Sequence, residues 1–253
     1  LNLASTDCNP NEMNWYEPPA EHRLREAEKF LISIGVLNAE GALVPMGYQL
    51  AQLPVHPRIG FALLLAKQKN CLSGFSLICA LMDFKNPIDF GRRTDFAEGK
   101  ETPTSDLLIF LKAYQKGSEN HFSGSTCKPL GIHGLRLREI ENTARLFCES
   151  LGEQFSFQHI LYEDVVEILL KVYPERLAYL ENKGTNSYRD SSGLSLQLFK
   201  ESVVRGSQWV LPLRVLEKKK QGRIVLEMDE VTAIKEPEIR KFLHDRIISK
   251  EDA

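Results

Sequence analysis

A run of basic side chains near the end of the chain is the clearest group whose type and spacing could do chemistry. Only one acid, Glu217, lies between residues 205 and 223, whereas residues 224–253 hold eight acids against five bases. Closely spaced lysine and arginine side chains can neutralise phosphates without reading a base sequence, as single-strand binders do. A solvated hairpin tip has the same pattern, and the sequence leaves both interpretations open. The basic residues are Arg205, Arg214, Lys218, Lys219, Lys220 and Arg223.

Aromatic residues in the same part of the chain could stack on bases if they face outward from a β-barrel. Tyr179, Tyr188 and Trp209 have this potential. Two aliphatic residues follow Trp209, so we favour burial in the core for that side chain. Polar residues precede Tyr188 and Arg189, so we expect these two side chains to be exposed and to contact nucleic acid.

Three arginines occur on one predicted helix, residues 134–151: Arg136, Arg138 and Arg145. Their guanidinium groups could bind phosphates. Glu139 and Glu141 are close enough in sequence to form ordinary ion pairs along the helix. Both interpretations remain open at this stage.

No set of residues predicts a reaction. The sequence contains no GxxxxGK[ST] motif and no Asp-Glu-Ala-His box, so the phosphate cradle and magnesium ligands of an ATPase are missing. His56 precedes Pro57 at a predicted helix start. No nucleophile or acid lies beside His56 in the sequence, so we favour a structural role for it, and we favour the same role for the other histidines. No CxxC or paired-histidine spacing predicts zinc. We therefore expect no catalytic residue, cofactor or metal in this chain.

Composition sets broad limits on the class of protein. The 253 residues, 43% of them hydrophobic, suffice for one large domain or two to three small ones. A net charge of -2 excludes a wholly basic nucleic-acid binder. The five widely spaced cysteines favour a reducing, cytoplasmic compartment. No apolar stretch is long enough for a membrane span. The sequence begins with Leu1 and not with an initiator methionine, so we expect the chain to start inside a longer protein.

The first part of the chain has the pattern of a winged helix. Residues 19–35 have helical apolar spacing, and Gly35 is a usual helix end. Residues 36–44 are two short apolar pieces around a polar turn, which predicts a small hairpin. A short helix over residues 47–51 follows. Helix, hairpin and small helix together make the core of a winged-helix unit.

The middle of the chain predicts a helical bundle. Residues 57–84 form two nearly all-apolar helices with a break at residues 70–73, so they must be buried. Residues 85–102 lack periodicity and predict a loop, after which Thr104 or Ser105 caps another helix. With the helix over residues 134–151, these segments predict an all-α bundle.

The hydrophobic period changes from 3.6 to 2 after a helix at residues 162–173. Residues 194–198 alternate, and residues 209–211 and 223–226 are short β-type runs. Glycines separate them at the spacing of a small closed barrel, and Pro237 begins a closing helix. The predicted fold is multidomain, α then β: a winged helix (1–55), a helical bundle (56–158) and a small barrel of the oligonucleotide-binding (OB) type with a closing helix (159–253).

Several spaced segments together resemble the helicase-associated region of DEAH-box helicases. They are Trp15 to Pro19, Phe30 to Gly47 and Leu53 to Arg58. Later stretches, Ser105 to Leu108 with Ala113-Tyr114 and Leu169 to Ala178, are similar to the HrpB-like bacterial branch of that family. The family usually carries Asp in place of Glu17 and Thr in place of Val44. A threonine there could hydrogen-bond the start of the next helix, and valine cannot.

The resemblance implies a winged helix, a helical "ratchet" bundle and an OB barrel packed against two RecA-like motor domains that this sequence lacks. ATP and Mg²⁺ would bind those motor domains, so the chain itself would be non-catalytic within an ATP-dependent RNA helicase. It would clamp single-stranded RNA against the motor, with Arg136, Arg138 or Arg145 reaching the strand's channel. RNA is preferred over DNA through the resemblance alone. The alternative is a docking module that receives an activating protein partner.

Overall fold

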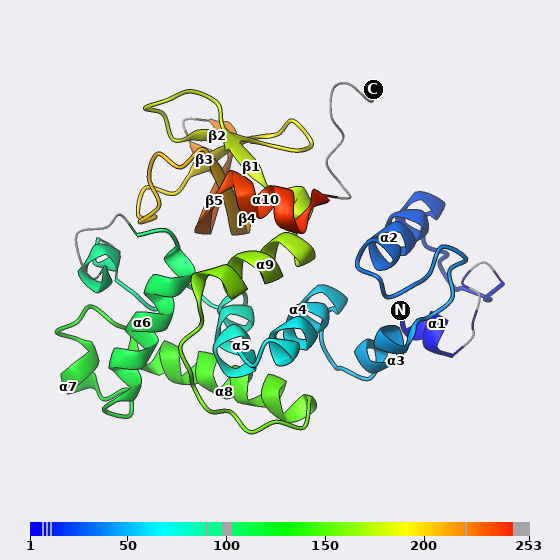
Figure 1. Cartoon of the computed structure of the whole chain (residues 1–253), viewed down its shortest axis with the longest axis horizontal. Helices are drawn as coiled ribbons and strands as arrows, with labels where there is room; N and C mark the ends of the chain where they lie inside the picture. The colour runs from blue at the N-terminus through cyan, green and yellow to red at the C-terminus, as the bar shows by residue number, and fades with distance from the viewer. Residues whose placement is uncertain are drawn as a thin grey trace. The chain divides into compact units, whose positions relative to one another are not determined.

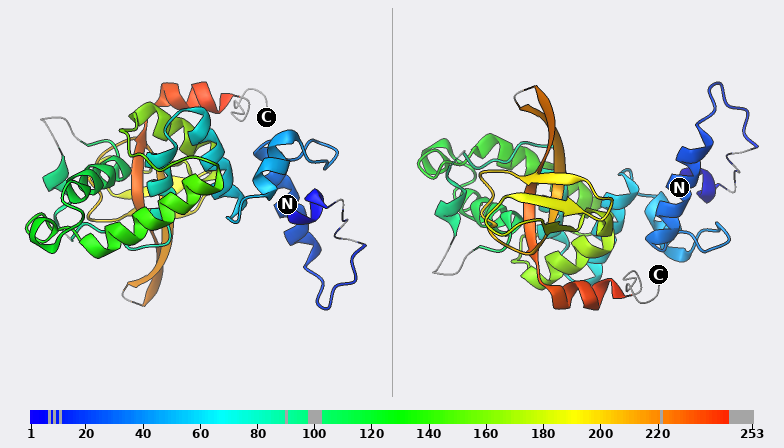
Figure 2. Two further views of the ribbon diagram at one scale, coloured as in Figure 1. Left: turned by 90° about the horizontal axis from the view of Figure 1, so that it is seen from below. Right: turned by 90° about the horizontal axis from the view of Figure 1, so that it is seen from above.

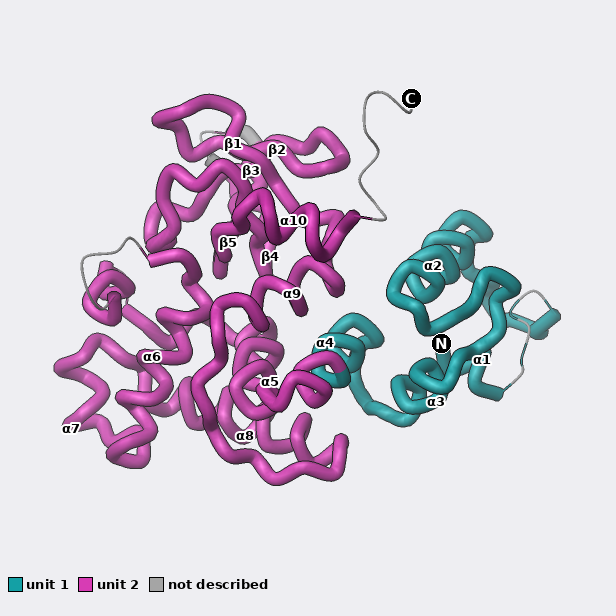
Figure 3. Tube along the Cα trace, in the orientation of Figure 1, with its two compact units in different colours: residues 1–64 teal, residues 65–253 magenta. Residues whose placement is uncertain are grey.

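The computed structural model describes residues 1–6, 8, 10, 12–89, 91–97, 103–220 and 222–244, apart from the side chains of Lys220 and Arg223. The chain forms two compact units, residues 1–64 and 65–253 (Figure 3). The order of helices followed by a five-stranded barrel confirms the predicted fold class (Figure 1). The finer limits, 1–55, 56–158 and 159–253, stay a prediction. None of the described helices has the length and apolar content needed to span a bilayer.

The first unit contains the winged-helix elements. They are α1 (Asn2–Ser5), α2 (Glu21–Ser33), α3 (Pro45–Ala51) and the start of α4 (Pro57–Gln68). Gly35 follows α2 with a φ of 69°, a left-handed conformation that suits glycine at a helix end. The predicted hairpin reduces to one bridge between Leu37 and Leu43. Val44 stands at the N-cap of α3 with no side-chain cap bond, as expected for valine.

The second unit begins with a helical bundle. Its helices are α5 (Leu72–Leu81), α6 (Asp106–Ser118), α7 (Gly124–Cys127), α8 (Gly134–Ser150) and α9 (Tyr162–Val172). The predicted break between α4 and α5 is present, and Asn70 there adopts a φ of 55°. All of α5 except Ser73 is buried, because α8 and α6 pack around it. This apolar helix is the centre of the bundle, as its sequence predicts.

The segment predicted as a loop contains one further element. Residues Arg93–Phe96 form the 3-10 helix η1, and Arg93 and Phe96 are both buried. The loop prediction was therefore wrong over these residues. The segment lacks periodicity because one turn is too short to show it, and because its buried arginine is stabilised by distant carboxylates that no local pattern reveals.

The barrel closes in the strand order β1-β2-β3-β5-β4, with β3 and β5 parallel and the other neighbours antiparallel. This is the five-stranded Greek-key barrel of the OB type that the sequence predicts. The short 3-10 helix η2 (Pro174–Arg176) precedes the barrel. The barrel consists of β1 (Ala178–Leu180), β2 (Ser187–Asp190), β3 (Ser195–Leu198), β4 (Trp209–Lys220) and β5 (Arg223–Ile234), and the closing helix α10 (Glu236–Phe242) follows it.

Strands β4 and β5 extend much further than their predicted runs. From the Lys218–Val225 pair to the turn, β4 and β5 pair only with each other, and this end of the hairpin projects from the barrel (Figure 2). We call residues 218–225 the arm. Both faces of such a two-stranded ribbon meet solvent, so its residues need no apolar alternation, and the sequence pattern does not mark it as strand.

The start of α6 joins the bundle to the barrel. The Ala233 amide donates to the Thr104 carbonyl at 2.7 Å, and the hydroxyls of Ser105 and Thr232 are 2.8 Å apart. Asp106 accepts hydrogen bonds from the amides of Val203 and Val231 at 2.8 and 2.9 Å. Ser105 also caps α6, one of the two caps predicted. Bundle and barrel are therefore linked by buried polar contacts.

Two glycines at the first position of a helix provide a test of packing in the bundle. A Cβ at Gly134 would lie 2.5 Å from the Phe122 carbonyl oxygen, whereas a Cβ at Gly124 would meet nothing within 4 Å. We expect Gly134→Ala to lower the free energy of unfolding by about 1–3 kcal/mol, since backbone must move. Gly124→Ala should leave it unchanged within about 0.5 kcal/mol. Urea unfolding measures both; equal effects would contradict the packing described.

Candidate nucleic-acid interface

Four residues form a row across the outer surface of the barrel, which we call the barrel row: Trp209, Tyr179, Arg189 and Ser195. In the strand register Tyr179 lies opposite both Trp209 and Arg189, and Arg189 lies opposite Ser195. Side chains alternate between the two faces of a strand. The barrel row faces outward because the adjacent residues are buried, namely Ala178, Tyr188, Leu196 and Val210.

Tyr179 and Trp209 form an aromatic pair in the barrel row. Their ring centroids are 5.8 Å apart in an edge-on arrangement, and Tyr179 is 40% exposed. Trp209 is half-buried, so it is less enclosed than the core position that its sequence context favours. An exposed ring held by a second ring offers a rigid face on which a base can stack.

Arg189 places a cation beside this aromatic pair. One of its guanidinium nitrogens donates to the Gly193 carbonyl at 2.7 Å, and another pairs with Glu181. Its side chain remains 42% exposed, as the sequence predicts for this position. Because Glu181 balances its charge, Arg189 adds little net positive charge to the surface. It contributes mainly a planar hydrogen-bond donor that is held in a fixed orientation.

The prediction that Tyr188 is exposed was wrong. Its side chain is fully buried in the barrel, and its hydroxyl donates to the Ser207 carbonyl at 3.0 Å. Polar neighbours in the sequence suggested exposure, but β2 is a strand, and alternation turns Tyr188 inward while Arg189 turns outward. Tyr188 therefore belongs to the core and not to a surface that could touch nucleic acid.

The arm carries two of the predicted lysines whose side chains the structure describes. Lys219 is exposed. Lys218 pairs with Glu227, and its ammonium lies 4.9 Å from the centre of the Phe199 ring. The predictions for Lys220 and Arg223 concern side chains outside the described residues. Lys219 is the described arm lysine best placed to meet a phosphate.

Arg214 is largely buried where the barrel meets the bundle, unlike the solvated position that a phosphate contact needs. Its guanidinium donates to the Phe84 carbonyl at 2.6 Å and pairs with Asp229 and Glu230 at 3.3 and 3.1 Å. Binding a phosphate would require these contacts to break. Arg205 is exposed and donates to the Val204 carbonyl, so it remains accessible at the surface.

The three arginines of α8 differ in their surroundings. Arg136 is half-buried and donates to the Asn86 carbonyl at 2.9 Å, and Arg138 is exposed and donates to the His121 carbonyl at 2.8 Å. Arg145 donates to Glu141 at 2.8 Å and lies 4.9 Å from the Phe155 ring centre. The ordinary helix pair considered from sequence is therefore present for Arg145. Arg138 and Arg145 keep exposed side chains.

The candidate residues do not form one continuous surface. Figures 1 and 2 show strands β1, β2 and β3 on the side of the barrel away from α5 and α8, and the arm projecting from the barrel. Helix α8 and strands β1, β2 and β3 thus lie on different sides of the second unit. A nucleic-acid strand that meets the barrel row and the arm need not meet α8.

Comparisons with known proteins agree on one family. The family model for the helicase-associated domain (HA2), winged-helix, matches residues 27–55. The ATP-dependent RNA helicase HrpA homolog of Haemophilus influenzae is 24% identical over 92% of this chain and 19% of its own length. The DExH-box ATP-dependent RNA helicase DExH2 of Arabidopsis thaliana is 32% identical over 57% of this chain and 10% of its own length.

A solved structure extends the likeness to nearly the whole chain. The crystal structure of E. coli DExH-box NTPase HrpB covers 95% of this chain with a TM-score of 0.63 and 15% sequence identity. Together these similarities support a C-terminal, helicase-associated region of a DEAH-box helicase. This region spans only 26% of the HrpB chain and smaller shares of the curated relatives above. At this identity HrpB shows a shared fold, and the HrpB-like branch stays a prediction.

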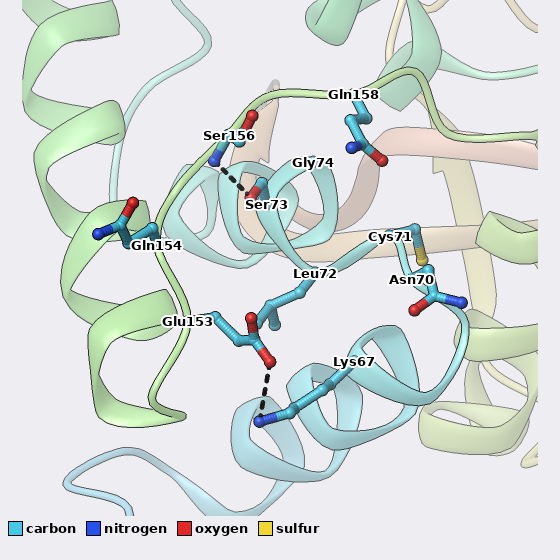
Figure 4. Close-up of a pocket in the computed structure, with 10 residues that line it drawn as sticks. All are labelled: Lys67, Asn70, Cys71, Leu72, Ser73, Gly74, Glu153, Gln154, Ser156 and Gln158. Carbon is cyan, nitrogen blue, oxygen red and sulfur yellow. Dashed lines mark hydrogen bonds and ion pairs between the residues drawn. The ribbon is translucent and has the colours of Figure 1, made fainter.

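The second unit also has a polar pocket of about 220 Å³ at the start of α5 (Figure 4). Lys67 and Glu153 point toward each other there, with 3.1 Å between Nζ and Oε1, and the Ser156 amide donates to the Ser73 hydroxyl at 3.0 Å. Cys71 lines the same pocket, and burial raises the pKa of its thiol to about 11. A thiol that stays protonated is a poor nucleophile. Cys71 is therefore not an activated nucleophile.

Proposed function

We propose that this helicase-associated region binds single-stranded RNA and clamps it within an ATP-dependent RNA helicase. The H. influenzae and A. thaliana relatives are both named as ATP-dependent RNA helicases, which supports this proposal. Two RecA-like motor domains, which this sequence lacks, would bind ATP and Mg²⁺ and supply the hydrolysis. Those motor domains would be intramolecular partners of the region.

The observation that carries the proposal is the barrel row. OB barrels bind oligonucleotides on the face of strands 2 and 3 and on the loops between strands 1 and 2 and strands 4 and 5. Tyr179 and Arg189 expose a ring and a guanidinium on the outer surface beside β2, and the arm is the connection between strands 4 and 5. Stacking on an aromatic ring next to cations is how single strands are held without reading their sequence.

The affinity for a labelled single-stranded RNA of about a dozen nucleotides tests the proposal. We expect measurable binding at low salt and a steep loss as salt rises, because phosphate contacts release counterions. Changing Lys218, Lys219 and Lys220 together to Ala should weaken binding and reduce the steepness of the salt dependence by roughly one unit for each phosphate that these lysines neutralise. Fluorescence anisotropy across a salt series measures both quantities.

Lys241 provides a matched control, since it is an exposed lysine on the closing helix α10, outside the barrel row, the arm and the loop between β1 and β2. Lys241→Ala should change the affinity much less than the triple variant. If the chain does not bind the single-stranded RNA at low salt, the proposal that this region binds RNA by itself is contradicted. A matching single-stranded DNA in the same series tests the preference for RNA, because only RNA carries the 2′-hydroxyl.

A docking role for a protein partner is the second candidate. Exposed apolar side chains in and beside the arm favour it: Val215, Leu216 and Ile224, the last of them 72% exposed. Exposed apolar side chains that gather on a surface are typical of protein interaction sites. Under this alternative the lysine variant would leave RNA affinity unchanged, whereas Ile224→Ser would weaken binding of an activating partner.

A cytoplasmic location is part of the proposal. Four of the cysteines are buried as small apolar side chains, as expected in a reducing compartment: Cys71, Cys79, Cys127 and Cys148. Reduction would then leave the fold intact. Unchanged circular dichroism on adding a thiol reductant is the corresponding measurement.

A further inference from the structure

Five ionisable side chains meet between the bundle and the barrel, and we call them the latch cluster. They come from η1, α6, β4 and β5, so they join elements far apart in the sequence. All are largely buried, with Glu230 and Asp106 showing no exposed side-chain surface. The members are Arg93, Asp106, Arg214, Asp229 and Glu230.

Both arginines of the latch cluster converge on one oxygen of Glu230. Arg93 and Arg214 place nitrogens 3.3 and 3.1 Å from Oε1. The Asn86 amide donates to the same oxygen at 2.8 Å. Arg93 also pairs with Asp229 at 3.0 Å. Oε1 is therefore saturated by donors from three different segments.

The other carboxylate oxygen of Glu230 has no such donors. Oε2 is buried and has no hydrogen-bond partner among the residues that the structure describes. Three carboxylates face two guanidiniums in the latch cluster, so full ionisation would leave one unbalanced negative charge. A buried charge without a partner is costly, and a proton on Oε2 removes it.

The backbone supports the same picture. Glu230 has a φ of 54°, in the left-handed region that a glutamate rarely adopts inside a strand. A strained backbone conformation of this kind persists only where surrounding contacts stabilise it, and such conformations are frequent at functional sites. The contacts that hold Glu230 here are those of the latch cluster.

We propose that the latch cluster is a proton-dependent latch: Glu230 takes up one proton at Oε2, which tightens the packing of the barrel on the bundle, and loses it as the pH rises. The bundle supplies Arg93 and Asp106, and the barrel supplies Arg214, Asp229 and Glu230. Lys218 approaches the same Phe199 ring as Arg93, with its ammonium 4.9 Å and the Arg93 guanidinium 5.4 Å from the ring centre, and its charge is paired with Glu227.

The direction of the pH effect follows from linkage. Burial, and next the charge of Asp229, raise the pKa of Glu230 from 4.5 to about 7. The folded protein therefore holds a proton that the unfolded chain has released between these two values. The stabilisation is complete below pH 4.5 and is lost as the pH rises through about 7.

Glu230→Gln tests the latch because glutamine is a permanently neutral replacement of the same shape. In a Trp15→Phe background, Trp209 is the remaining tryptophan and reports unfolding of the barrel in urea. At about pH 8 we expect Glu230→Gln to lower the unfolding constant by about a hundredfold or more relative to the parent, and at about pH 5 the two should agree within about fivefold. Glu217→Gln, the same change at an exposed position, should match the parent at both pH values.

Asp229→Asn is the second variant, since it also removes one negative charge from the latch cluster. With that charge gone the pKa of Glu230 should fall, so the pH dependence between about pH 5 and pH 8 should become smaller, while burial still keeps part of it. A constant ratio between Glu230→Gln and its parent at both pH values would overturn the proposal. So would a full pH dependence in Asp229→Asn.

Discussion

Replacing Asp106 with Ala should destabilise the second unit by about 3–5 kcal/mol. The carboxylate accepts hydrogen bonds from the Val203 and Val231 amides and lies 3.6 Å from Arg93. Its removal leaves two buried amides without acceptors and reduces the charge that balances Arg93. Urea unfolding followed by Trp209 fluorescence, in the Trp15→Phe background, measures the loss.

Asp95→Ala is the matched control for this change. Asp95 is also an aspartate paired with an arginine, Arg92, but the side chains of both are about half exposed. Exposed ion pairs contribute little to stability, so the variant should unfold close to the parent. If the two variants lose similar stability, the buried contacts of Asp106 do not join bundle and barrel as described.

Tyr188→Ala should destabilise the barrel by about 3–5 kcal/mol, because a large, fully buried aromatic side chain is removed from its core. Tyr188→Phe keeps the ring and loses only the hydrogen bond to the Ser207 carbonyl, so its cost should be about 1 kcal/mol. The same urea experiment measures both variants. A stable Tyr188→Ala protein would contradict the inward orientation of this residue.

Tyr179→Ala is the counterpart of Tyr188→Ala on the outer face of the barrel. Tyr179 is 40% exposed, so its removal should cost little stability but should weaken RNA binding. Loss of one base-stacking ring corresponds to about 1–3 kcal/mol, or roughly 5- to 150-fold in affinity. The pair of tyrosines thus separates stability from binding. Equal effects of both variants on affinity, at matched folded fractions, would contradict this division.

The helical half of the fold follows from local patterns in the sequence. Gly35 ends α2, Ser105 caps α6, and the all-apolar α5 becomes the centre of the bundle. Each of these features depends on residues within about one or two helical turns, so periodicity and capping residues suffice to predict them. The OB barrel followed from the change to a period of 2 and from its glycine-containing turns.

The orientation of barrel residues could not be predicted in the same way. Strands β1 and β2 have three and four residues, too few for alternation to show which side faces the core. The polar neighbours of Tyr188 therefore favoured the surface, which was wrong. The register that brings Ser195 beside Arg189 is set by strand pairing and not by either segment alone. Alternation from the buried Leu196 could have placed Ser195 outward, but not next to Arg189.

The role of Arg214 depends on contacts that are distant in the sequence. It occurs in the basic run, so the sequence groups it with the arm lysines. In the structure it is bound by Phe84, Asp229 and Glu230, from another loop and another strand. Counting charges along the sequence therefore assigned too many residues to the basic surface, because it included at least this one arginine that is largely buried.

Photo-cross-linking of a single-stranded RNA containing 4-thiouridine to the whole chain, followed by mass spectrometry of the cross-linked peptides, tests the central claim most directly. The account predicts cross-links to peptides containing Tyr179 or Trp209, and their loss in Tyr179→Ala. These side chains present the rings of the barrel row on which bases would stack. Cross-links confined to residues 1–64, or none at RNA concentrations that saturate binding, would contradict it.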